Sequence, residues 1–112
     1  MATATALYTP EVLALATSLA HYPLTDDLPL RGQARSQSCG STLDMGLSLE
    51  EAAIARIGLR AHACAIGQAA AAIFAGHCAG LDRAGIAAAQ AEVADWLAGG
   101  ALPAWPGIAA IA

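Results

Sequence analysis

A chain of 112 residues is long enough for one domain with its own core and needs no disulfide bonds to fold. The apolar fraction is 57%, but much of it is alanine, so we expect a thin core of closely packed helices. Nine acidic residues outnumber five basic ones, all arginine, and the net charge of -4 argues against a nucleic-acid-binding surface. With no signal peptide predicted and three cysteines, the composition favours cytoplasmic thiols or metal ligands over a disulfide framework.

A membrane span is the first alternative to weigh, because residues 61–81 contain no charged side chain and are about as long as a bilayer-spanning helix. His62, Gln68 and His77 interrupt this stretch, and alanine does not supply the hydrophobicity that insertion requires. We therefore expect no membrane segment.

The first predicted helix begins at Thr9, a hydroxyl cap that is followed by proline at the first helical position. The apolar positions that recur at helical spacing are Val12, Leu13, Ala16, Leu19 and Ala20. The helix is expected to end near His21, and residues 21–35, with two prolines and no periodicity, predict a long surface connection. Asp26 and Asp27 in this connection are interpreted as solvated acids rather than a metal-binding pair.

Alternating apolar residues predict a half-buried strand over residues 42–49, directly after Cys39 and Gly40. A second strand is predicted over residues 54–63, with residues 50–52 as the reversal. If the two strands pair as a hairpin, Cys39 precedes the first and Cys64 ends the second. Both thiols then lie at the same end of the sheet.

A joint between strand and helix is predicted at Cys64. Upstream, side chains alternate with period two, so Arg60, His62 and Cys64 share one side of the strand. Downstream, the unpaired N–H groups and the positive dipole end of a helix favour a negatively charged sulfur. The alternative is that Cys64 is a small buried apolar residue, as free cysteines often are.

Two further helices are predicted, over residues 65–79 and from the capping residue Asp82 to Gly99-Gly100. Their expected apolar stripes are Ile66, Ala69, Ala70, Ile73 and Phe74 in the first helix, and Ile86, Ala89, Val93, Trp96 and Leu97 in the second. The tail beyond residue 100 ends on apolar residues, which is unusual for a complete domain.

The opening Y-T-P-E-V-L, the Cys39-Gly40 turn before the hairpin, and the joint A-C-A-I-G-Q-A resemble the NifU/IscU-type iron-sulfur cluster assembly scaffolds, particularly a short, Ala-rich bacterial branch. The resemblance covers about residues 8–96. It implies a SufE/NifU-like α+β fold in which a small antiparallel sheet of about three strands packs against helices. We expect a single domain over residues 1–112, without the C-terminal helix of longer relatives.

The resemblance also implies a site of three cysteines and an aspartate that holds iron or a 2Fe-2S cluster. Cys39 and Cys64 match the first two cysteines, whereas Ser41 stands where the family has the aspartate. The pair His77-Cys78 resembles the family's third cysteine, which follows a histidine, but Cys78 comes only 14 positions after Cys64. The predicted metal ligands are Cys39, Cys64, His62 and Cys78, with His77 and Asp44 as further donors considered.

Such a scaffold is not an enzyme: it receives sulfur from a cysteine desulfurase and passes the cluster to apo Fe-S proteins, as a monomer or a weak homodimer that shares one cluster. A second hypothesis is a degenerate module that binds zinc or only the desulfurase, since tetrahedral Cys/His sites also suit zinc. A third is a thiol enzyme, with Cys39 or Cys64 as nucleophile and His62 or His21 as base, although no oxyanion-hole motif accompanies them.

Overall fold

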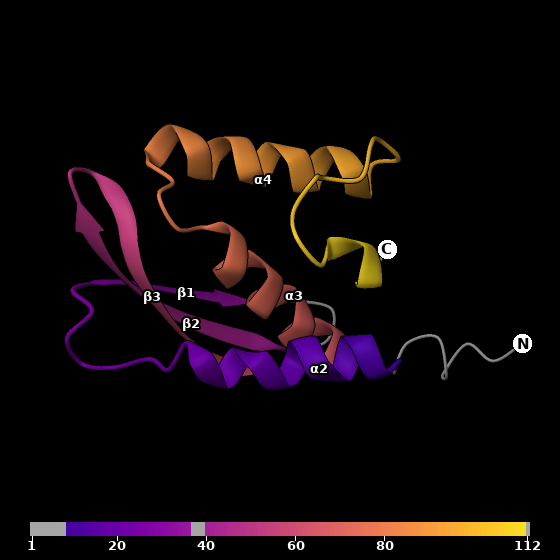
Figure 1. Cartoon of the computed structure of the whole chain (residues 1–112), viewed down its shortest axis with the longest axis horizontal. Coiled ribbons are helices and arrows are strands. Elements are labelled where there is room, and N and C mark those ends of the chain that lie inside the picture. Colours follow the sequence, from indigo (N-terminus) through magenta and orange to yellow (C-terminus); the bar gives the residue numbers. More distant parts are fainter. Residues whose placement is uncertain (1–8, 37–39, 112) are drawn as a thin grey trace, which may run out of the picture.

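Three antiparallel strands with helices on one face form an α+β fold in the computed structural model, which describes residues 9–36 and 40–111 (Figure 1). The elements are α2 (Pro10–Ser18), η1 (Leu19–His21), β1 (Leu30–Arg35), β2 (Thr42–Glu50), β3 (Ala53–His62), α3 (Ala65–His77), α4 (Arg83–Leu97) and η2 (Ile108–Ile111). The sheet order is β1-β2-β3. The predicted fold class, a small three-stranded sheet packed against helices, is confirmed.

Helix α2 begins as predicted: the Thr9 hydroxyl oxygen accepts the backbone N–H of Val12 at 3.2 Å, and Pro10 occupies the first turn. Val12 is fully buried. The predicted apolar stripe is wrong in part, because Leu13 is 45% exposed, Ala20 is also exposed, and Leu15 packs against the core instead. Only a narrow side of α2 rests on α3, so one leucine of the helix is left in solvent.

The surface connection predicted over residues 21–35 is wrong at its end, since Leu30–Arg35 forms the edge strand β1. All six residues of β1 are exposed. A strand that buries neither face has no need of large apolar residues at alternate positions, and its period-two signal is correspondingly weak.

The hairpin of β2 and β3 forms where the sequence predicts it, and β3 ends at His62, one residue before the expected end. The reversal consists of Glu51 and Ala52, which have φ angles of 51° and 68°. Positive φ at both central residues is what a two-residue hairpin turn of the primed type requires, although glycine or asparagine is more usual there.

The segment from Tyr22 to Leu28 crosses the sheet face opposite the helices, over Gly46 and Gly58, which pair across β2 and β3. A Cβ at Gly58 would lie 2.4 Å from the Pro23 carbonyl oxygen, and one at Gly46 would lie 2.9 Å from the Leu28 Cβ. Leu28 is only 2% exposed. The two glycines therefore permit a contact between segment and sheet that any larger residue would block.

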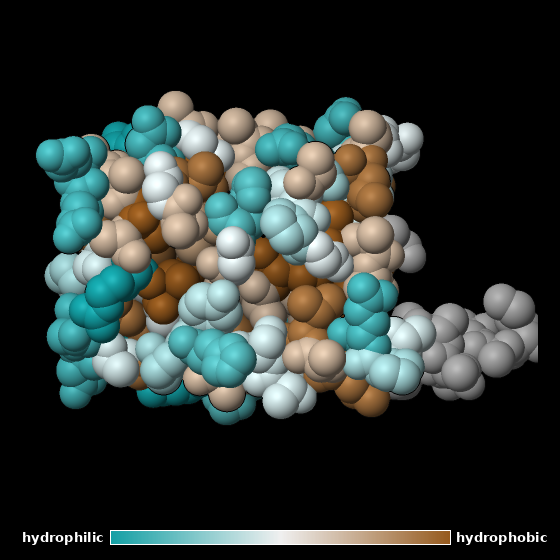
Figure 2. All heavy atoms as spheres, viewed as in Figure 1, coloured by the Kyte–Doolittle hydropathy of each residue, from teal (hydrophilic) through white to brown (hydrophobic). Residues whose placement is uncertain are grey.

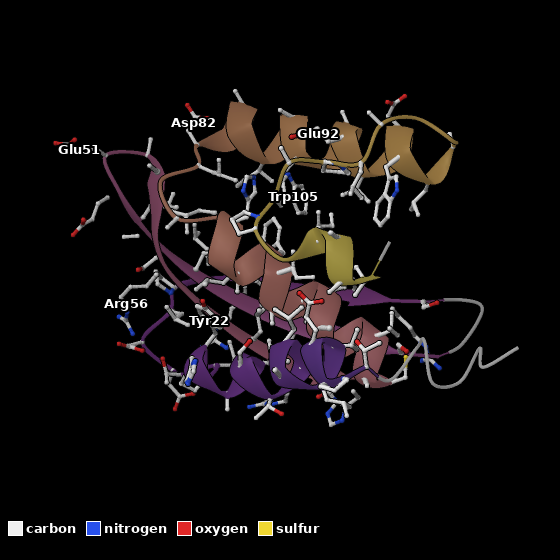
Figure 3. The ribbon with its side chains drawn as sticks, turned by 45° about the vertical axis from the view of Figure 1, so that its right-hand side comes forward. Tyr22, Glu51, Arg56, Asp82, Glu92 and Trp105 are labelled. Atoms are coloured by element: carbon white, nitrogen blue, oxygen red, sulfur yellow. The ribbon has the colours of Figure 1, made fainter. Side chains whose placement is uncertain are left out.

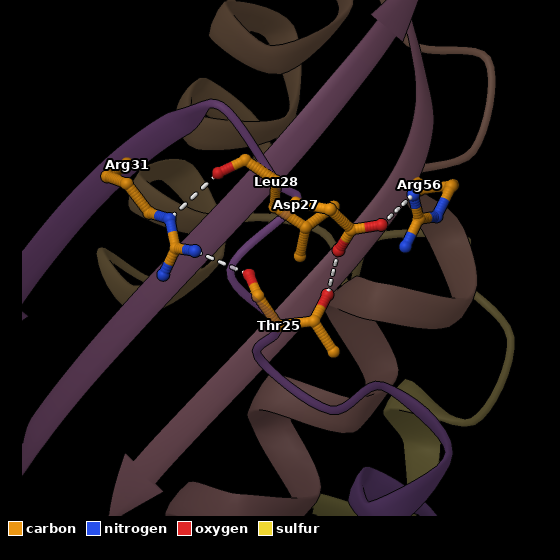
Figure 4. A network of polar contacts seen from close by, with 5 residues as sticks. All are labelled: Thr25, Asp27, Leu28, Arg31 and Arg56. Atoms are coloured by element: carbon orange, nitrogen blue, oxygen red, sulfur yellow. Dashed lines mark hydrogen bonds and ion pairs between the residues drawn. The ribbon is translucent and has the colours of Figure 1, made fainter.

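Polar contacts hold the same segment at both margins of the sheet (Figure 4). Arg56 of β3 forms an ion pair with Asp27 at 2.9 Å, and the Thr25 hydroxyl also donates to this carboxylate. Arg31 of β1 donates to the carbonyls of Leu28, at 2.8 Å, and Thr25. Asp27 is thus exposed to solvent, as predicted, with its side chain 61% exposed, and it is also the ion-pair partner of Arg56.

Helix α3 lies at the centre of the helical layer, where Ala69, Ala72, Ile73 and Ala75 are buried. The tail folds back between α3 and α4, so that Trp105 and Ile108 join Ile73 and Ala89 in one cluster (Figure 3). His77 stacks on Trp105 with ring centroids 4.7 Å apart. The apolar tail therefore completes the core.

The two predicted helical stripes hold with one exception each. Ala70 is exposed on α3, and Leu97 is 75% exposed at the end of α4. The Asp82 cap is confirmed, since its carboxylate accepts the Gly85 N–H at 2.8 Å. No helix among the described residues combines the length and the apolar character that crossing a bilayer requires.

Gly58→Ala tests the close approach of segment and sheet. The added methyl group would overlap the Pro23 carbonyl, so we expect a loss of about 2 kcal/mol or more in the free energy of unfolding, measured by urea denaturation. The matched control is Gly32→Ala in β1, where nothing lies within 4 Å of the added Cβ. Equal losses in the two variants would contradict this account.

The Asp27–Arg56 pair predicts a pH dependence of stability. Hydrogen bonds from Arg56 and Thr25 lower the pKa of Asp27 from 3.8 to about 2, so the folded state binds this proton less readily than the unfolded chain. The stabilisation is complete above about pH 4 and is lost as the pH falls toward 2. Asp27→Asn should unfold more easily at neutral pH, and its difference from the parent should shrink over that window. In an Arg56→Gln background, Asp27→Asn should show a smaller difference at neutral pH, because the ion pair is already absent.

Candidate metal-binding site

Cys64 lies between β3 and α3, where the chain passes from the sheet to the helical layer. It is the N-cap residue of α3, with extended backbone (φ -67°, ψ 173°), and its side chain makes no capping hydrogen bond. The thiol is exposed. The Cys64 carbonyl accepts the Gln68 N–H at 2.9 Å, and the Gln68 side chain donates to the Ala63 carbonyl at 3.0 Å. These bonds fix the turn while leaving the sulfur available for other chemistry.

Gly67 keeps this turn tight. A Cβ at Gly67 would lie 2.8 Å from the Ala63 Cβ and 4.0 Å from the Cys64 sulfur. Any larger residue would therefore press on the strand-to-helix joint and crowd one side of the thiol. The close contacts at the joint therefore favour glycine at position 67 of the A-C-A-I-G-Q-A stretch.

The strand register brings the connection between β1 and β2 to the same end of the sheet as Cys64. Thr42 opens β2 and pairs with Arg35 on one side and His62 on the other. Beyond this row, the Ser36 N–H donates to the Ser41 carbonyl at 2.8 Å, and Gly40 has a φ angle of +73°. The described residues on either side of 37–39 are thus held at the end of the sheet where β3 finishes. Cys39 itself lies outside the described residues.

His62 is the last residue of β3 and is exposed, two positions before Cys64. Arg60, exposed, and Asp44, half-buried, form the next cross-strand pair on the same face. The end of the sheet therefore carries an imidazole, a guanidinium and a carboxylate on the last two rows of β3 and β2, and the thiol of Cys64 follows two positions after His62. Among the described residues, however, no group of three or more Cys, His, Asp or Glu is arranged to hold a metal ion.

Cys78 lies at the opposite end of α3, where it is the C-cap residue. The thirteen helical residues between the two cysteines span about 20 Å, so the structure does not bring Cys78 and Cys64 together. Cys78 is 1% exposed, and its thiol donates to the Ala75 carbonyl at 3.4 Å. Burial raises the pKa of the Cys78 thiol, which favours the neutral form over a metal-binding thiolate.

The remaining histidines are also remote from Cys64. His77 belongs to the last turn of α3 and stacks on Trp105. His21 lines a groove with Ala75 and Cys78, at the far end of α3. It is therefore not placed to act as a base for Cys64, and the thiol-enzyme hypothesis keeps only His62 for that role.

Sequence reasoning did not find β1 and so missed that Arg31 and Arg35 share a sheet face with Arg60 and His62. The available signal was R-G-Q-A-R, in which long polar side chains alternate with glycine and alanine. Such alternation is typical of an edge strand, but its small residues score poorly as strand formers.

No protein-family model and no curated protein matches the sequence. Solved structures nevertheless share the fold. The N-terminal part of a nitrogen-fixing NifU-like protein from Brucella abortus is 21% identical with a TM-score of 0.80, over 98% of this chain and 76% of that one. A putative iron-sulfur cluster assembly scaffold protein for the SUF system from Fervidobacterium islandicum is 14% identical with a TM-score of 0.82, over 96% and 81%. The expected resemblance to NifU/IscU-type scaffolds is thus confirmed at the level of the fold.

The environments of Cys64 and Cys78 predict opposite thiol reactivity. In a Cys39→Ser background, an aromatic disulfide reagent should modify Cys64 rapidly, because it is exposed, and should reach Cys78 only as the chain unfolds. Adding Cys64→Ser should remove the fast phase alone, and both thiols should react alike in denaturant. A Cys78 thiol as reactive as Cys64 in the folded protein would contradict the burial described above.

Proposed function

We propose that this chain is an iron-sulfur cluster assembly scaffold, on which iron and sulfide are held by cysteine thiolates before transfer to apo-proteins. The observation that carries the proposal is the exposed Cys64 thiol at the N-cap of α3, at the same end of the sheet as the chain segment that contains Cys39. The names of the two similar structures, a NifU-like protein and a SUF scaffold, support this reading of the site.

The electrostatics of the joint suit an anionic cargo. A cluster with thiolate and sulfide ligands carries negative charge, which the unpaired N–H groups in the first turn of α3 stabilise. Arg60 and His62 stand on the adjoining strand and add cationic or hydrogen-bonding groups. Cys64 is therefore the ligand that the geometry supports best, and Cys39 is its proposed partner from the β1–β2 connection.

The donor count defines what else the site requires. A 2Fe-2S cluster takes four protein donors, mostly thiolates, with histidine as an accepted substitute. Cys39 and Cys64 supply two, and His62 is the nearest further donor among the described residues. Two chains that each contribute two thiolates would also reach four, in a weak homodimer. Cys78 is not included, because it is buried at the far end of α3.

Ser41 is the feature that favours a second candidate function. A neutral hydroxyl in place of the family's aspartate removes one anionic donor from the site. The chain would then act as a module that binds zinc, or that only contacts a cysteine desulfurase, without a stable cluster. In either case the proposed partners are a cysteine desulfurase and apo Fe-S proteins, and the proposed location is the cytoplasm.

Anaerobic reconstitution with iron, cysteine and a cysteine desulfurase tests the proposal. Visible charge-transfer bands, with iron and sulfide bound in equal amounts, are expected for the parent chain. Cys39→Ala and Cys64→Ala should each abolish the bands. Cys78→Ala is the matched control and should retain them, because this thiol is remote from the site.

Two results would overturn the assignment. Loss of the bands only in Cys78→Ala would place the site at the other end of α3. Bound zinc without bands in the parent chain, lost again in Cys64→Ala, would favour the degenerate module. His62→Ala separates the remaining choices, since a ligand histidine changes the absorption spectrum whereas a neighbouring one leaves it intact.

A further inference from the structure

The two edges of the sheet differ in how they are covered. The outer edge of β3 is hydrogen-bonded by other segments: the Leu59 N–H donates to the Tyr22 carbonyl, and the Ile54 N–H to the Leu81 carbonyl, both at 2.8 Å. The outer edge of β1 has no backbone partner among residues 9–36 and 40–111. An uncovered edge strand is a ready template for another chain.

The ladder between β1 and β2 determines which groups face this open edge. The Ser36 N–H donates to Ser41, and bonded pairs alternate along an antiparallel ladder, so Ala34 and Gly32 also turn their backbone groups toward β2. The backbone N–H and C=O groups of Arg31, Gln33 and Arg35 consequently point outward. They are spaced as the donors and acceptors of an added strand require.

The face of β1 that carries Leu30, Gly32 and Ala34 is apolar and open. Nothing lies within 4 Å of a Cβ built on Gly32, and Leu30 is 47% exposed. Leu30 also lines a groove of about 620 Å³ between the sheet and the first half of α4. The large apolar residues of this groove are Leu30, Leu47, Leu49, Leu81 and Ile86. Figure 2 shows apolar side chains exposed in recesses of the surface below α4.

The opposite face of β1 is cationic, although the chain as a whole is acidic. Arg31 and Arg35 stand on this face with Arg60 of β3 and with one acid, Asp44 of β2, which lies between Gln33 and Arg60. Within the described residues the ion pair is that of Arg56 with Asp27, so none of these three guanidinium groups has a carboxylate partner. Arg31 donates to neutral carbonyls, which leave its charge uncompensated.

The charges of Arg31 and Arg35 determine which kind of strand can pair with the open edge of β1. A second copy that paired antiparallel about Gln33 would place its Arg35 directly opposite Arg31, and its Arg31 opposite Arg35. Like charges at directly opposed positions destabilise a strand pair. An acidic segment at the same positions would gain two cross-strand pairs of opposite charge.

We propose that β1 docks an extended segment of an acidic partner protein as an added strand. Its acidic side chains lie beside Arg31 and Arg35, and its alternating apolar side chains lie over Gly32 and Ala34, next to the groove at Leu30. The backbone groups of Arg31, Gln33 and Arg35 supply the hydrogen bonds. This surface is independent of cluster binding, so either proposal can fail without the other.

The probe is a fluorescent peptide in which glutamate alternates with leucine and valine, titrated against the full chain by anisotropy. We expect saturable binding that weakens as salt is added, because the charges are exposed. A peptide with lysine in place of glutamate should bind about tenfold more weakly or not at all, since two cross-strand charge pairs become repulsive. Equal binding of both peptides, or no binding of either, overturns the proposal.

Gln33→Pro tests strand addition directly. Proline removes an outward N–H without touching the bonds to β2, so binding should be lost while thermal unfolding of the chain stays cooperative. Gln33→Ala, which keeps the N–H, should bind as the parent does. Arg35→Glu should weaken binding about fivefold or more, with Arg35→Gln in between.

Binding of N-methylated peptides tests strand addition even if Gln33→Pro disturbs the fold. Methyl groups on the alternate peptide nitrogens that face β1 should abolish binding, whereas methyl groups on the other set should be tolerated. Unchanged affinity for both methylated peptides would exclude a strand-like contact. Light scattering that shows a dimer of the chain, dissociated by Arg35→Glu, would assign the edge to a second copy and overturn the proposal.

Discussion

The structure depends on the seating of the Tyr22–Leu28 segment across Gly46 and Gly58. This contact buries Leu28 against the sheet and places the Tyr22 carbonyl where it accepts the Leu59 N–H. The same segment contacts both outer strands through Arg31 and Arg56. Gly46 and Gly58, which form one cross-strand pair, thus determine how closely the segment can approach the sheet. The row Arg35–Thr42–His62 lies at the end of the same sheet, beside the joint that carries Cys64.

On the helical side of the sheet, the core forms around α3, a helix that is rich in alanine. Alanine at positions 69, 72 and 75 lets neighbouring segments approach α3 closely, but contributes little buried apolar area of its own. Trp105 and Ile108 from the tail supply that area and link α3 to α4. The apolar character of residues 105–111 is therefore explained by their packing in the core. His77 is used in this packing, which removes it from the set of available metal donors.

Features encoded by neighbouring residues could be predicted from the sequence, and features that depend on distant contacts could not. The caps at Thr9 and Asp82, the hairpin and the joint at Cys64 each follow from short patterns with local physical causes. Strand β1 did not, because it is exposed on both faces and its pairing with β2 is set from outside the segment. For the same reason the sequence could not tell whether Cys78 faces a site or the core. The local sequence His77-Cys78 is compatible with both positions. Cys78 is buried because of how other segments pack around α3.

The candidate site and the open edge of β1 are connected through one short stretch of chain. Strand β1 runs into residues 36–41, which lead to β2 and contain Cys39. A strand added along β1 would end beside the Ser36–Ser41 pair, and therefore at the end of the sheet where Cys64 is exposed. A partner bound at this edge would thus reach the same end of the sheet as Cys64, with β2 and β3 between it and that residue. If both proposals hold, such an arrangement would give a protein that donates to or accepts from the scaffold a fixed position at this end of the sheet.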